Sequence, residues 1–303
     1  MKTFAFQKLL FSLTFVILIS TGIQAQLISE SQWFFGNSTY NLQSDKNGDI
    51  VYLEERMATP FGIGGPVVIN SPYTGNLIFY SDGQRIYDAS HQLIADDLTG
   101  NPAINRAAVA ARVPNSVLPD GSERYYIITN SGNNGPNQIQ YTEVDPNRIG
   151  NGTIDAPLGE VVNRNNPTDL DNPSEAMIVV QDSARTRQWL ITQNRETFDF
   201  RVSQVVIGGI DAAQVYELDT LTRPGFEAAS FAFNPDSSLL AIAPKDPNRN
   251  IWLANFNPGT GELSFNSVIR NTGFADDQNE SVYDVEWSPD GSKLYFSRFG
   301  AST

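Results

Sequence analysis

The side chains that most often perform enzyme chemistry are scarce in this chain of 303 residues. It has no cysteine and a single histidine, His91. This excludes disulfides, thiolate zinc sites and cysteine nucleophiles, and it leaves almost no room for a histidine-rich metal site or a Ser-His-Asp triad. His91 stands in the polar segment Asp88–Gln92, which predicts a surface turn, and no Gly-x-Ser-x-Gly nucleophile motif occurs. We therefore expect no catalytic residue and no cofactor.

Two acidic segments are the candidates for a hard cation. Asp45–Asp49 resembles the start of a calcium loop, but Ile50 replaces the glycine of its sixth position and Arg56 the bidentate acid of its twelfth. Asn47-Gly48 is more simply the turn of a hairpin. The second segment contains Asp276, Asp277 and Glu280. A solvated loop is the simpler interpretation of that segment, and we expect no metal site.

Loops rich in glycine and asparagine are the remaining candidates for ligand binding. Gly62–Pro66 ends in proline and no helix follows it, so it does not predict a phosphate site. Long polar loops are expected at Asn130–Asn137 and from Asn163 to Pro173, and such loops often carry binding. Neither loop contains an aromatic residue, so a ring that stacks on a sugar must come from a neighbouring strand.

The charge of the chain bears on its partners. It has 34 acidic and 20 basic residues, a formal net charge of −14. A uniformly acidic chain repels phosphate backbones, so nucleic acid is not an expected partner. The carboxylates are spread along the sequence, a distribution that favours a role in solubility over an acidic site. Neutral or cationic partners such as glycans, proteins or cation-bridged polymers are expected instead.

The N-terminal segment predicts export. Met1–Ala25 resembles a secretory signal peptide, with Lys2 and Lys8 before the apolar stretch Leu9–Ile19 and a small residue before the expected cleavage at Gln26. The apolar stretch is too short for a transmembrane anchor. No cysteine follows, which argues against a lipoprotein anchor. The mature chain would carry a net charge of −16 and is expected in the periplasm, at the cell surface or outside the cell, with no membrane span.

An internal repeat with a period near 54 residues organises the rest of the chain. Phe233–Ile242 matches Trp287–Phe296 at an offset of 54 residues. Weaker copies place equivalent turn positions at 74, 120 and 182, ahead of 236 and 290. The residues expected in these turns are Gly75, Asp120, Gly121, Asp182, Asp236, Asp290 and Gly291.

Each copy predicts two strands joined by a tight turn. Before the last turn, alternation would place Tyr283, Val285 and Trp287 on a core face, and Phe233 should be the core equivalent of Trp287 in the preceding unit. Further strands are predicted at Ile251–Phe256 and Glu262–Phe265.

Four strands in about 50 residues correspond to one blade of a β-propeller. A β-sandwich would explain the strands but not the near-constant period. Because 27 asparagines, 23 glycines and 17 prolines also disfavour helices, we predict an all-β propeller of four-stranded blades. The first strand of each blade should line its central tunnel.

Two resemblances accompany this prediction. Trp287–Ser297 resembles the Trp-Asp-like repeat of the Tol-system periplasmic protein and of prolyl-oligopeptidase propellers. Gln32–Gly36, Gly75–Gly83, Ile86–Asp88 and His91-Gln92 are similar to the N-terminal propeller region of large secreted proteins of Bacteroidota. In that family further β-domains and a gliding-motility or type IX secretion sorting domain follow the propeller. The resemblance implies a secreted or surface role, often adhesive, with no catalytic residues.

The blade count leaves two arrangements open. About five units are visible, and the last shows only two strands. Either Ser31–Phe35 adds a strand to that last sheet, or the chain is part of a six- or seven-bladed propeller within a longer multidomain protein. The second is favoured, because a sheet cut after two strands has an unpaired edge. The expected organisation is a signal peptide at 1–25 and a propeller at 26–303 that is incomplete at its C-terminal end and lacks the family's sorting domain.

Three functions are consistent with these observations. The favoured one is a non-enzymatic binding or adhesion module, expected to be monomeric. The second is a hydrolase or lyase that uses carboxylates and a bound cation in the funnel of the propeller. The third is an accessory domain of a longer peptidase.

Overall fold

The computed structural model describes most of the chain from position 66 onward and three short strands before it. The described residues are 32–34, 41–44, 50–53, 66–71, 74–116, 123–132, 135–182, 184, 186–218, 227–245, 250–270 and 281–299. The expected signal peptide, the acidic segments at 45–49 and 276–280, Gly62–Gly65, Asp120 and Gly121 lie outside them.

Six antiparallel sheets follow one another along the chain. The first contains β1 (Gln32–Phe34), β2 (Asn41–Ser44) and β3 (Ile50–Leu53). The second contains β4 (Val67–Asn70), β5 (Leu77–Ser81), β6 (Ile86–Asp88) and β7 (Leu93–Ala95). The third contains β8 (Ala108–Arg112), β9 (Tyr125–Asn130), β10 (Gln138–Asp145) and β11 (Glu160–Asp171).

The fourth sheet has five strands: β12 (Pro173–Gln181), β13 (Gln188–Asn194), β14 (Phe200–Val206), β15 (Gly209–Ile210) and β16 (Gln214–Tyr216). The fifth contains β17 (Ala228–Phe233), β18 (Leu239–Pro244), β19 (Ile251–Asn257) and β20 (Glu262–Ile269). The sixth contains β21 (Ser281–Trp287) and β22 (Leu294–Phe299).

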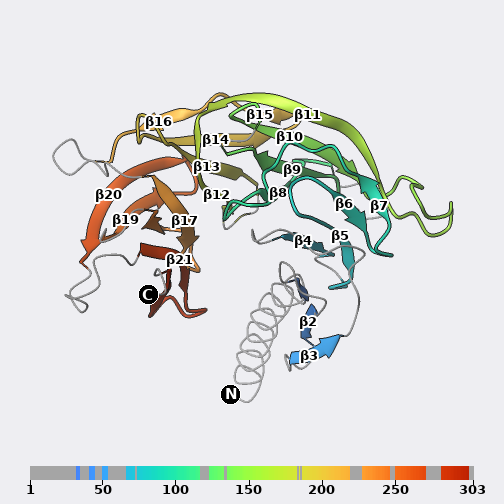
Figure 1. Cartoon of the computed structure of the whole chain (residues 1–303), viewed down its shortest axis with the longest axis horizontal. Helices are drawn as coiled ribbons and strands as arrows, with labels where there is room; N and C mark the ends of the chain where they lie inside the picture. The colour runs from blue at the N-terminus through green and yellow to red at the C-terminus, as the bar shows by residue number, and fades with distance from the viewer. Residues whose placement is uncertain are drawn as a thin grey trace, which may run out of the picture.

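The sheets are arranged as the blades of a propeller. They follow one another round a common centre (Figure 1). The first strands β4, β8, β12, β17 and β21 lie next to one another in that order, and the later strands of each sheet lie farther out. All five turn positions found in the sequence fall between the first and second strands of a sheet. The prediction of an all-β propeller with four-stranded blades is therefore confirmed, and no helix occurs in the part of the chain that the model describes.

The N-terminal strands do not close the propeller in the way that the sequence allowed, with Ser31–Phe35 as an added strand of the last sheet. β1 pairs with β2, with Trp33 opposite Leu42, and not with β22. The addition of Ser31–Phe35 to the last sheet is therefore wrong. β2 pairs in turn with β3, with Ser44 opposite Ile50, so these strands form the hairpin expected around Asn47-Gly48. The sequence repeat did not reveal this three-stranded sheet.

The repeat turns are stabilised by their aspartates. The Asp290 carboxylate accepts hydrogen bonds from the Ser288 hydroxyl (2.6 Å) and from the backbone N–H of Ser292 (3.0 Å), and these bonds lower the pKa of Asp290 to about 2. Ser237 (φ 59°) and Gly291 (φ 68°) take the left-handed conformation at the same step of their turns. A Cβ at Gly291 would lie 3.1 Å from the Pro235 ring, so the turns of neighbouring blades are in contact.

The hydrophobic core is divided into clusters that lie between successive sheets. Phe200 of β14 and Phe231 of β17 are both fully buried, with ring centroids 5.9 Å apart, and Phe233 packs against the same cluster. Trp287 packs against the cluster between the fifth and sixth sheets. Tyr283 does not share the core face, because the strand pairing shifts between Val282 and Asp284.

Buried amides connect neighbouring blades. The Asn130 side chain donates to the carbonyl of Ser174 at the start of β12 (2.7 Å), and the Gln193 side chain accepts from the N–H of Ala228 at the start of β17 (2.7 Å). Gln188 of the fourth sheet both donates to and accepts from the backbone of Arg112 at the end of β8. These bonds satisfy backbone groups that would otherwise be buried without partners.

Trp189 connects the fourth and fifth blades on their outer side. Its indole N–H donates to the carbonyl of Pro258 (2.8 Å) in the loop between β19 and β20. Gly261 in that loop has a φ of 77°, and a Cβ there would lie 2.6 Å from the indole ring of Trp189. The loop therefore approaches the ring at a distance that only glycine allows.

We predict that Gly261→Ala lowers the free energy of unfolding by about 2–3 kcal/mol, because it adds a clash with Trp189 to the strain of a positive φ. Gly208→Ala is the matched control: Gly208 also has a positive φ (91°), but its Cβ would meet nothing within 4 Å. Strain alone should cost about 1 kcal/mol there. Urea unfolding of both variants checks the difference, and equal losses would contradict the contact with Trp189.

Candidate functional site

One end of the propeller carries both kinds of loop that can form a site. In sheets whose strands alternate in direction, the connectors between sheets and the loops between second and third strands emerge at the same end. We call this end the loop face. The repeat turns lie at the opposite end and contribute to neither site described below. These turns contain Gly75, Asp182, Asp236, Asp290 and Gly291.

The connector between β7 and β8, residues 96–107, crosses the loop face. The N–H of Gly100 donates to the carbonyl of Gly83 (2.9 Å), and the N–H of Asn101 donates to the carbonyl of Asn130 (2.9 Å). A Cβ at Gly100 would lie 2.5 Å from the Gly83 oxygen. The connector is thus held close to the loops of the second and third sheets.

A cavity of about 230 Å³ lies beside this connector. It is lined by Gln84, Leu98, Thr99, Gly100, Asn101, Gly135 and Pro136, and we call it the amide pocket. All of these residues are uncharged, although the whole chain is strongly acidic. The Thr99 hydroxyl donates to Gln140 (2.9 Å), and the Asn101 side-chain oxygen accepts from the N–H of Ala103 (3.0 Å).

The two predicted polar loops have different outcomes. Asn130–Asn137 supplies Gly135 and Pro136 to the amide pocket and lies mostly in a loop. The segment from Asn163 to Pro173 is not a loop, because most of it belongs to the long outer strand β11 and Pro173 begins β12.

The same connector reaches the centre of the propeller. The Asn105 side chain, only 8% exposed, donates to the carbonyls of Ala229 in β17 (3.0 Å) and Tyr283 in β21 (3.3 Å). A residue that leads into the third sheet is therefore bonded to the first strands of the fifth and sixth. Arg106 follows it and interacts electrostatically with Tyr283.

Charged side chains surround this point. We call Asn105, Arg106, Glu175, Glu227, Lys245 and Tyr283 the axial cluster. The Lys245 ammonium lies 2.7 Å from a Glu175 oxygen and 3.4 Å from a Glu227 oxygen. Burial would lower the pKa of Lys245, but these two carboxylates outweigh it and raise that pKa. The pKa of Tyr283 is also raised, by burial and by the charges of Glu175 and Asp284 against the opposing effect of Arg106.

The contacts of the axial cluster bear on the alternative function, a hydrolase or lyase that uses carboxylates and a bound cation. Glu175 and Glu227 already share the positive charge of Lys245, and Asp284 accepts a hydrogen bond from Ser230. Within the described residues, no group of three or more histidine, aspartate or glutamate side chains is placed to hold a metal ion. These carboxylates act as partners of other side chains of the protein.

The single histidine belongs neither to the amide pocket nor to the axial cluster. His91 has a φ of 63° in the turn between β6 and β7, and its Nδ1 is 3.0 Å from the Tyr80 hydroxyl. The expected turn is thus observed at His91. The sequence had no motif for the residues that do form the amide pocket, since Leu98–Asn101 contains only ordinary loop residues.

Comparison with known proteins finds similarity to solved structures only. No family model and no curated protein matches the sequence. A protein from Lactobacillus plantarum aligns over 89% of this chain and 74% of its own, at 14% identity and a TM-score of 0.52. A candidate 6-phosphogluconolactonase from Bacteroides uniformis (17% identity, TM-score 0.44) covers 86% of this chain and 72% of its own. The Cps50 (Swd1) β-propeller domain of Myceliophteria thermophila (12% identity, TM-score 0.38) covers 90% and 94%. At these identities the likeness concerns the fold alone.

We predict that Lys245→Met lowers the free energy of unfolding at pH 7 by up to about 1 kcal/mol, a modest value because the side chain is 41% exposed. The folded-state pKa of Lys245 lies above the ordinary 10.5, so its contribution is present below pH 10.5 and is lost as the pH rises through the folded pKa. The difference between wild type and variant in denaturant unfolding should therefore shrink at more alkaline pH. A difference that grew with pH would contradict the ion pairs.

Proposed function

We propose that this protein is an exported, non-enzymatic binding module that holds a short neutral glycan in the amide pocket. The observation that carries the proposal is the lining of that pocket. In a chain with a net charge of −14, it is formed entirely by uncharged residues, and three of them, Gln84, Thr99 and Asn101, have side chains that can donate and accept hydrogen bonds.

The chemistry of the lining suits a sugar. Hydroxyl groups both donate and accept, and so do the side-chain amides of Gln84 and Asn101. Leu98 and Pro136 add apolar surface for the C–H groups of a pyranose. A ligand hydroxyl that loses its water without gaining a hydrogen bond costs binding free energy. A site with several amide groups therefore discriminates between ligands by the hydrogen bonds that it offers.

An aromatic ring is available on the same face. Tyr283 of the axial cluster is 37% exposed, and Asn105 links it to the connector that also lines the amide pocket. A second sugar unit that extends from the pocket toward the axis could stack on this ring. The strong acidity of the chain disfavours polyanionic ligands by repulsion.

The export and surface role rest on the sequence. Met1–Ala25 has the pattern of a signal peptide, and the resemblance to secreted propellers of Bacteroidota with type IX secretion or gliding-motility domains supports an adhesive role. No helix in the described part of the chain is long and apolar enough to span a membrane.

We predict that Gln84→Ala weakens glycan binding about fivefold or more, because it removes one hydrogen-bonding group from the pocket. Gln84 is exposed, so the free energy of unfolding should stay unchanged. The measurement is a glycan array at physiological salt, followed by calorimetric titration of the best ligand. Gln92→Ala is the matched control, since Gln92 is an exposed glutamine in the turn at the opposite end of the same sheet.

Two outcomes would contradict the proposal. Binding that Gln84→Ala and Gln92→Ala leave equally strong would place the glycan elsewhere. Turnover in a hydrolase panel with added calcium, abolished by a chelator, would favour the cation-dependent enzyme instead.

We further predict that export removes about the first 25 residues, as the signal-peptide pattern requires. Mass spectrometry of the secreted protein should find an N-terminus near Gln26. Secreted material that retains Leu9–Ile19 would contradict a cleaved signal peptide.

A further inference from the structure

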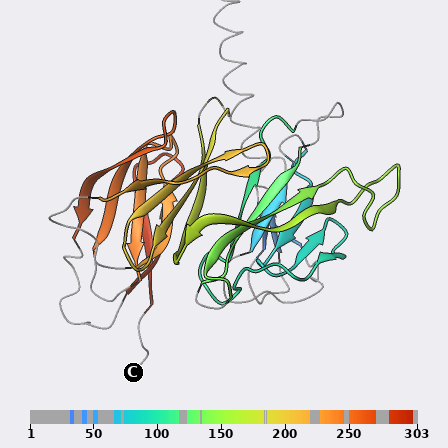
Figure 2. The same ribbon diagram turned by 90° about the horizontal axis from the view of Figure 1, so that it is seen from above.

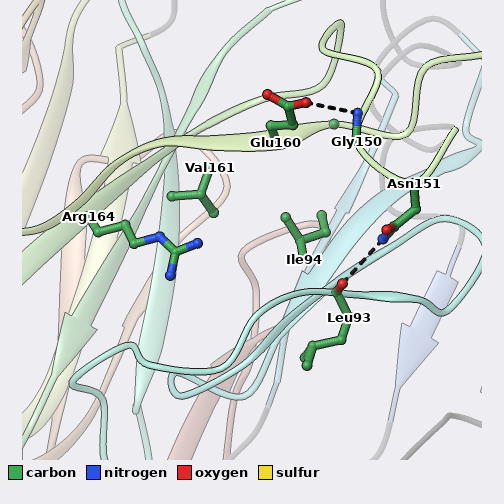
Figure 3. A pocket seen from close by; sticks show the side chains of 8 residues that line it. Leu93, Ile94, Gly150, Asn151, Glu160, Val161 and Arg164 are labelled. Atoms are coloured by element: carbon green, nitrogen blue, oxygen red, sulfur yellow. Dashed lines mark hydrogen bonds between the residues drawn. The ribbon is translucent and has the colours of Figure 1, made fainter. Parts of the chain in front are cut away.

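A second cavity, of about 280 Å³, lies on the outer rim of the propeller. Leu93 and Ile94 of β7 and Glu160, Val161 and Arg164 of β11 line it, with Gly150, Asn151 and Gly159 of the hairpin between β10 and β11. We call it the rim pocket (Figure 3). It shares no residue with the amide pocket or the axial cluster. The β10–β11 hairpin above it projects beyond the blades at the right of Figure 2.

Hydrogen bonds fix the frame of the rim pocket. The Asn151 side chain donates to the Leu93 carbonyl (3.2 Å) and to the Asp88 carboxylate (3.1 Å), which ties the hairpin to the second sheet. At the neck of the hairpin, a Cβ on Gly150 would lie 2.0 Å from the carbonyl oxygen of Gly159. The pocket is therefore formed before any ligand arrives, which reduces the entropic cost of binding.

Arg164 gives the pocket its chemistry. Figure 3 shows its guanidinium directed toward the side on which Ile94 and Leu93 lie. One nitrogen of this group, Nη1, donates to Asp97 at 2.7 Å. A guanidinium has five N–H donors in a planar fork, so Arg164 can take a second carboxylate. The existing pair is exposed on both sides, and such pairs contribute little stability, so a ligand can compete with Asp97.

The surroundings of Arg164 favour an extended peptide. β7 and β11 are the outermost strands of their sheets, and no described strand pairs with their outer edges. An added peptide strand can bond to such an edge and place alternate side chains into adjacent pockets. The shifts in the pairing of β11 with β10 limit the regular part near the pocket to Glu160 and Val161.

Apolar side chains flank the same edge. Leu93 is 45% exposed and Val162 41%, and on the hairpin Ile149 is 47% and Ile154 83% exposed. Leu93, Ile94 and Val161 line the pocket together with Arg164, and the other exposed apolar residues lie on the adjoining strand and hairpin. This combination is complementary to an acidic side chain that has apolar neighbours.

We propose that the rim pocket binds an extended segment of a partner protein, with an aspartate or glutamate side chain on the Arg164 guanidinium and apolar side chains against Leu93, Ile94 and Val161. The segment lies along the outer edge of β11 at Glu160 and Val161. This site is separate from the proposed glycan site, so either can fail without the other.

The test uses the mature protein and fluorescein-labelled peptides capped at both ends, with a Val-Asp-Val core, and fluorescence polarisation as the readout. A Val-Asn-Val peptide and a Val-Asn-Val peptide with a free C-terminal carboxylate are the comparisons. We expect binding of the Val-Asp-Val peptide that weakens as salt is raised. Arg164→Gln should weaken it about tenfold or more, because the bonds to a charged group are lost. Arg164→Lys, which keeps the charge but not the fork, should fall between.

A further variant, Asp97→Asn, distinguishes ligand binding by Arg164 from a purely structural role of Arg164. It removes the competing carboxylate, so the Val-Asp-Val peptide should bind more tightly. Arg270→Gln and Asp155→Asn are the matched controls, because they make the same changes of charge at exposed residues that do not line the pocket. Thermal unfolding of each variant checks its fold.

Three results would overturn the proposal. They are the absence of binding at millimolar peptide, equal binding of the aspartate and asparagine peptides, and equal effects of Arg164→Gln and Arg270→Gln. Preference for the free C-terminal carboxylate over the aspartate peptide would overturn the assignment to an acidic side chain.

Discussion

The backbone at the centre of a propeller must find hydrogen-bond partners without the help of a neighbouring strand. The first strand of each sheet pairs on one side only, and its other side faces the axis and the next blade. Here side-chain amides satisfy much of that demand: Asn130 bonds to Ser174, Gln193 to Ala228, and Gln188 to both backbone groups of Arg112. Because each amide comes from one sheet and its backbone partner from the next, these bonds also set how the blades are placed against each other.

The connector at 96–107 and the amide pocket, both on the loop face, depend on how the blades are placed against each other. The connector at 96–107 reaches from the second sheet to the axis because Asn105 finds two carbonyls there, on β17 and β21. On its way, Gly100 and Asn101 are held against Gly83 and Asn130, and this close approach leaves the amide pocket beside them. These backbone contacts hold the walls of the pocket in place, which reduces the entropic cost of binding a ligand there.

The sequence was informative where a local pattern has one structural solution. The turns at Asp236 and Asp290 could be aligned because an aspartate that accepts the N–H two residues later, followed by a left-handed residue, is defined within a few positions. The sequence was not informative where contacts between residues far apart in the chain determine the structure. Alternation placed Tyr283 in the core, but a shift in the pairing after Val282 turns it toward the axis. The polar segment after Asn163 was expected to be a loop, yet β10 pairs with most of it and makes it a strand. The amide pocket was invisible, since its residues come from three loops that only the fold brings together.

The bond pattern of Asn105 also has a mechanical consequence. A force applied to the connector on the loop face is not carried by one blade alone, because Asn105 transmits it to the first strands of two blades across the axis. Because one side chain bonds to two first strands, a load on the connector acts on both strands, and both hydrogen bonds must break before the connector comes free. The central asparagine is therefore the point at which tension on the connector is shared between the fifth and sixth blades.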